Sequence, residues 1–157
     1  MDTQKMQGEF EKIMEHVIDH GAMVPRPASI EDIDLCNEDL LEFDFHALPE
    51  EYEDFLSMLN GFAWNGIEFF GTDLVTDTET NYTLIDIVTF NEEMEEYYDT
   101  DCYLLIGRSD EDVYVYNTGN EKYEVLDRCG KDVMEEHDHF LAFFIHVVGC
   151  RINPDEQ

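Results

Sequence analysis

The stretch LPEEYEDFLSMLNGF, residues 48–62, predicts a short helix that ends at a glycine. Pro49 suits the first helical position, because its missing N–H would have no partner there in any case. Acidic residues follow, and carboxylates near a helix start are favoured by the positive end of the helix dipole. Tyr52 and Phe55 begin an apolar face at helical spacing, and Gly61 supplies a left-handed residue that ends helices. A helix of about three turns with one core-facing side is expected.

Two more helices are expected upstream, at residues 8–20 and 30–41. The glycine and two prolines of 21–29 predict an extended connector between them. Ser29 is placed to cap the second helix, with Asp32 three residues later in a capping-box position. The residues expected to face the core are Phe10, Ile13, Met14, Val17 and Ile18 in the first helix, and Ile30, Ile33, Leu40 and Leu41 in the second.

The pattern becomes mostly β after the opening stretch. An aromatic run bounded by glycines predicts a strand at 66–70, and the polar run 72–82 predicts a surface loop. Residues 84–97 fit a helix, although 83–90 are also prone to form a strand. Short runs separated by turns then predict an antiparallel meander, and Asp138 is placed to cap a closing apolar helix. The meander strands are expected at 102–107, 112–117, 122–127 and 132–136, and the closing helix at 139–148.

The composition indicates one folded and strongly acidic domain. The chain has 157 residues, which favours a single domain (residues 1–157). The helices and strands expected above make this an α+β domain with an antiparallel meander packed against helices. It has 39 acidic and 8 basic residues, for a formal net charge of −31, and its hydrophobic content of 43% still indicates a folded core. Such a charge repels nucleic acid and anionic membranes and attracts basic proteins, so a basic protein partner is expected. Solubility or adaptation to high salt is the alternative explanation.

The cysteines and the N-terminal residues favour a reduced, cytoplasmic protein. Cys36, Cys102, Cys129 and Cys150 are scattered without a CxxC pair, and a chain of this length does not need disulfides to fold. The first fifteen residues are polar and amphipathic, unlike a secretory signal. No apolar run approaches the roughly twenty residues that span a bilayer.

No motif points to catalysis, a cofactor or a metal. GxSxG, GxxxxGK[ST] and a GxGxxG followed by a helix are all absent from the sequence. His16 and His20 have a zinc-compatible spacing, but they lie opposite the apolar face of their helix. Residues 77–88 lack the glycine and glutamate that a calcium loop needs at its sixth and twelfth positions. The histidines of 135–139 fall at a helix start, where Asp138 already has a capping role. The chain is therefore expected to be non-enzymatic, with no cofactor and no metal.

One tryptophan and two acidic runs are the expected partner-binding surface. Trp64 is the only tryptophan, and tryptophan is enriched at binding hot spots, although a partly buried scaffold role is commoner. The acidic runs fall on predicted loops or polar faces, where they either form a solvated surface or mimic an array of phosphates. The expected partner-binding residues are Trp64, Asp73, Asp77, Glu79, Asp110, Glu111 and Asp112.

The ordered set of motifs carries a family resemblance. The motifs are Leu48-Pro49, Tyr52, Phe55-Leu56, Asn60-Gly61, Phe69-Phe70-Gly71, the run YLLIGRSDEDVYVYN at 103–117, and Phe140, Phe143 and Phe144. Together they resemble the SUKH superfamily, and within it the YrhA-like bacterial members. The resemblance covers about residues 28–150 and leaves residues 1–27, the first helix and its proline-rich connector, outside. It implies an α+β fold and a binding protein rather than an enzyme.

The resemblance also implies a function. Many bacterial members of that superfamily are immunity proteins, which neutralise a toxin made by the same cell or its kin, often a nuclease. The expected mechanism is stoichiometric occlusion of a basic toxin domain. Two alternatives stay open at this point. One is a regulatory or scaffolding adaptor for another basic protein, since yeast relatives of the superfamily act as scaffolds in cell-wall regulation. The other is a salt-adapted hydrolase with an unrecognised site.

Overall fold

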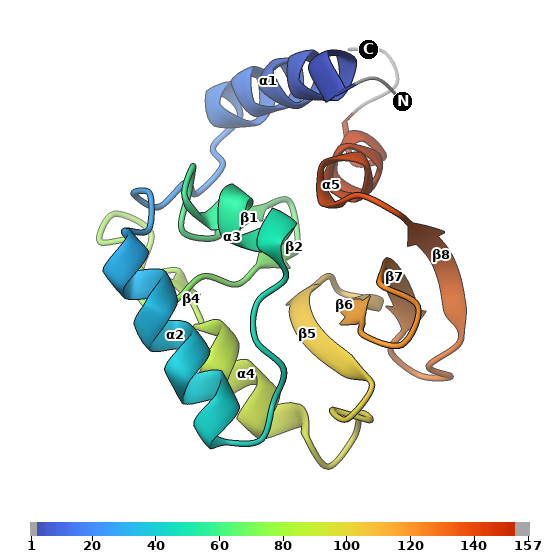
Figure 1. Ribbon diagram of the computed structural model, residues 1–157. Coiled ribbons are helices and arrows are strands. Elements are labelled where there is room, and N and C mark those ends of the chain that lie inside the picture. Colours follow the sequence, from blue (N-terminus) through green and yellow to red (C-terminus); the bar gives the residue numbers. More distant parts are fainter. Residues whose placement is uncertain (1–2, 153–157) are drawn as a thin grey trace.

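The computed structural model describes residues 3–152, which form an α+β fold as the sequence predicts (Figure 1). The helices are α1 (Thr3–Asp19), α2 (Ile30–Glu42), α3 (Glu50–Leu56), α4 (Ile87–Met94) and α5 (Phe140–Gly149). The strands are β1 (Phe62–Trp64), β2 (Ile67–Phe69), β3 (Val75–Thr76), β4 (Thr83–Leu84), β5 (Tyr103–Arg108), β6 (Asp112–Asn117), β7 (Lys122–Asp127) and β8 (Val133–His137).

The main sheet has six antiparallel strands in the order β1-β2-β5-β6-β7-β8. Strands β5 to β8 lie side by side in chain order, which confirms the predicted meander. Strand β2 joins its first strand through the pairs of Glu68 with Arg108 and Phe69 with Gly107. The sheet therefore carries the short β1–β2 hairpin at one edge and β8 at the other.

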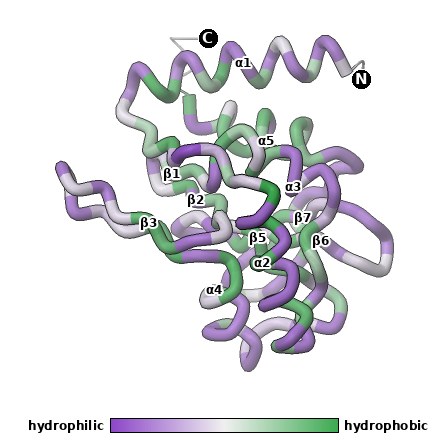
Figure 2. Tube along the Cα trace, turned by 60° about the vertical axis from the view of Figure 1, so that its left-hand side comes forward, coloured by the Kyte–Doolittle hydropathy of each residue, from purple (hydrophilic) through white to green (hydrophobic). Residues whose placement is uncertain are grey.

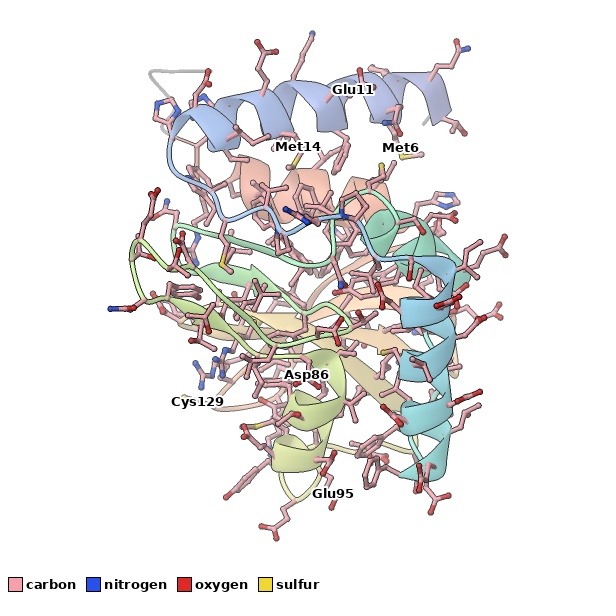
Figure 3. The ribbon with its side chains drawn as sticks, turned by 90° about the vertical axis from the view of Figure 1, so that its left-hand side faces the viewer. Met6, Glu11, Met14, Asp86, Glu95 and Cys129 are labelled. Carbon is pink, nitrogen blue, oxygen red and sulfur yellow. The ribbon has the colours of Figure 1, made fainter. Side chains whose placement is uncertain are left out.

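Aromatic side chains of α5 form the centre of the core. Phe140 and Phe143 are fully buried and contact the rings of Phe69 and Tyr123 in the sheet. Helix α1 packs over α5 from outside. Figure 3 shows Met6 and Met14 pointing from α1 toward α5 and Glu11 pointing away from it. The amphipathic pattern of α1 is thus satisfied by covering the closing helix.

Two buried polar side chains tie the helices to the sheet. The Tyr52 hydroxyl of α3 lies 2.5 Å from Phe70 O and 3.1 Å from Ile106 O. The Asn91 amide of α4 donates to Leu105 O at 2.9 Å and accepts from Leu105 N at 3.0 Å. Asn91 therefore takes the place of a neighbouring strand at this point of β5, and it leaves no buried backbone group of Leu105 unpaired.

The opening helix is shorter than the sequence predicts. Pro49 has an extended backbone, with ψ 149°, and is the N-cap rather than the first helical residue. The helix ends at Leu56, before Gly61. Gly61 has φ +110°, and a side chain there would meet Leu84 at 2.9 Å. Glycine is therefore needed just before β1 and not at the end of the helix.

Other elements also differ from expectation, and α1 begins at Thr3 instead of residue 8. The predicted surface loop is partly ordered as the β3–β4 hairpin. The helix expected at 84–97 begins only at Ile87, because the Asp86 carboxylate accepts a hydrogen bond from Thr89 N and caps it there. Asp138 does not cap α5; it lies 3.2 Å from Lys122 Nζ instead. The Glu51 carboxylate accepts from Phe140 N at 3.3 Å and so supplies the cap from α3.

Several helical details follow the prediction and others do not. Ser29 and Asp32 form the expected capping box, with hydrogen bonds of 3.1 and 3.0 Å. Ile18, Ile30 and Leu41, however, are exposed, because each lies near a helix end beyond the reach of the core. Among the described residues, no helix is both long and apolar enough to cross a membrane.

Candidate functional site

A tight turn between β1 and β2 positions Trp64. Asn65 and Gly66 have φ of 50° and 83°, which is the pattern of a two-residue hairpin turn with both central residues left-handed. The Trp64 indole is partly buried, and its Nε1 donates to His20 O at 3.2 Å at the end of α1. The ring of His16 meets the indole edge-on, 6.2 Å away. Trp64 therefore stands as a fixed wall between α1 and the sheet.

A second hairpin, β3–β4, projects from the body beside β1 and β2 (Figure 2). Asp77 N donates to Tyr82 O, and Asn81 takes φ +61° to close the turn. The Asp77 carboxylate accepts from Glu79 N at 2.9 Å. These bonds hold the acidic tip as a defined turn, although its side chains face water.

The two hairpins and the β5–β6 turn enclose a cleft of about 840 Å³, which we call the Trp64 cleft. Three of the residues predicted to bind a partner, Trp64, Asp77 and Asp110, line it together. The six lining residues that matter for its chemistry are Trp64, Glu68, Asp77, Tyr82, Arg108 and Asp110. A cleft with an aromatic wall and a few converging polar groups is the usual form of a binding site.

An ion pair forms the floor of the Trp64 cleft. Glu68 is only 7% exposed, and its carboxylate lies 2.5 Å from Arg108 Nε. The guanidinium of Arg108 lies over the rings of Phe70 and Phe90, 5.8 and 5.2 Å from their centroids. The Tyr82 hydroxyl donates to the other oxygen of Glu68, and burial together with this bond raises the pKa of Tyr82. The buried carboxylate is thus satisfied on both oxygens.

Arg128 holds the β5–β6 turn, which forms one side of the Trp64 cleft. Its Nη1 lies 3.3 Å from both Ser109 O and Asp110 O, and its backbone N donates to Glu111 O at 3.0 Å. Only eight basic residues exist in the chain, and two of them, Arg108 and Arg128, line this cleft. Arg128 thereby braces the loop that presents the exposed Asp110 carboxylate, whereas the side chain of Arg108 is paired with Glu68 on β2.

The serine of the cleft is held by its own loop. Its one serine, Ser109, is buried, and its hydroxyl accepts hydrogen bonds from Asp112 N at 3.1 Å and Glu111 N at 3.4 Å. Among the lining residues that the structure describes, none is a histidine or a cysteine. The Ser109 hydroxyl therefore stabilises the β5–β6 turn by accepting from its backbone N–H groups.

The remaining predicted residues lie outside the Trp64 cleft. Asp73 precedes β3 and accepts from the Thr72 hydroxyl, and Glu79 is at the exposed hairpin tip. Glu111 and Asp112 line a separate cavity of about 340 Å³ between β6, β8 and α5. Burial, together with the charges of Glu111 and Asp127, raises the pKa of Asp112.

Glu68, Tyr82 and Arg108 were not predicted as site residues. Only Glu68 could have been recognised from the sequence. It stands inside the short apolar run IEFF, and a carboxylate there must be paired if the strand is buried. Its partners come from positions 14 and 40 residues away, and only the fold brings them together.

No protein-family model matches the chain, and no curated protein matches it in sequence. The resemblance to the SUKH superfamily therefore stays a prediction, and the Trp64 cleft is the main structural guide to function.

Proposed function

We propose that the chain is a non-enzymatic binding protein that docks a basic protein partner at the Trp64 cleft. By its resemblance to the SUKH superfamily, the partner is a toxin domain, often a nuclease, and the chain neutralises it by stoichiometric occlusion. One observation supports the choice of this cleft as the docking surface. An aromatic wall and the carboxylates Asp77 and Asp110, picked from the sequence for separate reasons, line the same cleft.

The chemistry of the cleft suits a lysine or arginine side chain. Trp64 offers a ring face for a cation, and the two carboxylates accept charge-assisted hydrogen bonds. The net charge of −31 would draw a basic domain toward the whole surface, and the cleft would fix its orientation. Because Arg108 and Arg128 already have partners within the chain, they leave these carboxylates as the acceptors for an incoming cation.

Co-expression with a basic toxin domain encoded beside this chain tests the proposal. Cells should survive the toxin only when this protein is present, and the two should elute together as a 1:1 complex at low salt. Death of the cells in both cases, with no complex on size exclusion, would rule out neutralisation. If another basic protein is bound instead, the chain is the adaptor that the sequence analysis left open.

Paired charge reversals locate the docking surface. Asp77→Lys with Asp110→Lys changes two cleft carboxylates, and Glu92→Lys with Glu93→Lys makes the same change in net charge on α4. The cleft pair should abolish protection in cells, whereas the α4 pair should retain it. Equal loss by both pairs would mean that total charge, and not the cleft, selects the partner.

A further inference from the structure

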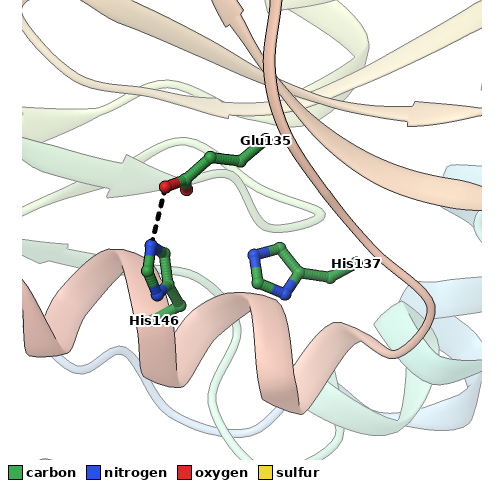
Figure 4. A group of neighbouring side chains, drawn as sticks. All are labelled: Glu135, His137 and His146. Atoms are coloured by element: carbon green, nitrogen blue, oxygen red, sulfur yellow. Dashed lines mark hydrogen bonds and ion pairs between the residues drawn. The ribbon is translucent and has the colours of Figure 1, made fainter.

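Two side chains of β8 and one of α5 converge where the strand meets the helix (Figure 4). Glu135 and His137 are two residues apart on β8, so they point to the same face of the strand. His146 is an exposed residue of α5, and this helix packs on β8. The site is at the edge of the sheet opposite β1, away from the Trp64 cleft.

The donor atoms are spaced as metal ligands are. His146 Nε2 lies 2.8 Å from Glu135 Oε1, and one ligand atom of each of Glu135, His137 and His146 lies within 4.8 Å of the others. Two ligands about 2.1 Å from a tetrahedral ion are separated by about 3.4 Å. Side-chain rotation alone can close the remaining gap, since the side chains of Glu135 and His146 are each 42% exposed.

The types of ligand select the class of metal. Two imidazoles and one carboxylate suit a first-row transition metal such as Zn²⁺, whereas Mg²⁺ and Ca²⁺ prefer oxygen ligands alone. The cavity of about 340 Å³ that Glu135 and His146 line leaves room for water as a further ligand. This combination differs from the many carboxylates of the surface, which attract all cations without a defined geometry.

We propose that Glu135, His137 and His146 bind one divalent transition-metal ion, of which Zn²⁺ is the expected occupant. The ion replaces the hydrogen bond between Glu135 and His146 and links the edge strand β8 to the closing helix α5. The site does not depend on the proposed binding function, because no residue of the Trp64 cleft takes part.

Titration of the chelator-treated full chain with Zn²⁺ tests the site. Calorimetry in about 0.15 M salt with excess Mg²⁺ should give one Zn²⁺ per chain, because salt and Mg²⁺ suppress binding by the acidic surface. The melting temperature should rise by about 5–10 °C at a free Zn²⁺ concentration near one hundred times the dissociation constant. Absence of saturable binding under these conditions would overturn the proposal.

Three variants decide which residues hold the ion. His146→Ala and His137→Ala should each weaken Zn²⁺ binding at least 100-fold, because even groups that only support a ligand contribute about 10–100-fold. His139→Ala is the matched control, since that imidazole contacts Glu51 instead, and it should bind like the parent. If His137→Ala fails to fold, the His146→Ala variant alone is sufficient, because His146 is exposed. Parent-like binding by His146→Ala would show that the ion sits elsewhere and would overturn the assignment.

Discussion

Glu68 Oε1 lies 2.5 Å from Arg108 Nε, across the paired strands β2 and β5, and the two side chains form the floor of the Trp64 cleft. The carboxylate is buried, and the guanidinium is held between it and the rings of Phe70 and Phe90. This pair explains how a carboxylate can be placed inside an aromatic strand. It also fixes the shape of the cleft on which the proposed function depends.

Glu68→Gln should destabilise the fold by about 1–3 kcal/mol. Breaking a buried pair typically costs about 3–5 kcal/mol, and the lower range is expected because the Arg108 side chain is 34% exposed. Urea unfolding at neutral pH measures the change. Glu79→Gln, at the exposed hairpin tip, is the control and should stay within about 0.5 kcal/mol of the parent. Equal stability of the two variants would contradict the role of the pair.

Asn91→Ala should cost about 2–4 kcal/mol of stability. The substitution leaves the N–H and C=O of Leu105 without partners inside the core, and each orphaned group costs about 1–3 kcal/mol. Denaturant unfolding compared with Glu92→Ala, an exposed neighbour on α4, separates this effect from helix propensity. A loss no larger than that of Glu92→Ala would show that water replaces the amide freely.

Asp112→Asn should stabilise the protein at neutral pH and lose this effect in acid. The pKa of Asp112 is raised in the folded chain, first by burial and then by Glu111 and Asp127, so its carboxylate is disfavoured there. That penalty is present above the folded pKa and fades as the pH falls through it toward the ordinary value of 3.8. The gain in melting temperature should exceed that of Glu92→Gln at about pH 7.5, and the difference should shrink as the pH falls and vanish below about pH 3. A gain that is the same at about pH 7.5 and below about pH 3 would contradict this explanation.

Salt should stabilise the folded chain. With 39 acidic and 8 basic residues, like charges repel in the compact state, and salt at 0.1 M screens them beyond about 10 Å. The melting temperature should therefore rise as monovalent salt increases from about 10 mM to about 0.5 M. A flat or falling curve in differential scanning calorimetry would mean that the carboxylates are compensated locally.

The sequence predicts the elements well where local chemistry determines them. Ser29 and Asp32 cap α2 as expected, and the alternating apolar residues of 103–127 form the meander. The start of α4 was wrong although its cap, Asp86, is local, and the cap of α5 was wrong because a distant group supplies it. Helix α5 starts without Asp138 as its cap because Glu51, 89 residues from Phe140, accepts its N–H. No local pattern contains that contact.

The candidate binding residues could likewise be predicted from the sequence only in part. Trp64, Asp77 and Asp110 could be chosen from residue type alone, but their common cleft depends on the turn at Asn65-Gly66. That dipeptide is a strong hairpin signal, and it would have predicted β1 and β2 as a pair. His146 could not be joined to Glu135 from the sequence, because the packing of α5 on β8 sets their distance.

The association rate with the basic toxin domain, measured by stopped flow at about 20 mM and about 0.5 M salt, tests the docking surface most directly. Steering by opposite charge raises association by about 10–10³-fold, so the parent should associate much faster at low salt. Asp77→Lys with Asp110→Lys should slow association more than Glu92→Lys with Glu93→Lys, and Trp64→Ala should mainly speed dissociation. A partner that binds all of these variants with the rates of the parent does not dock at the Trp64 cleft, and that result would contradict the proposed function.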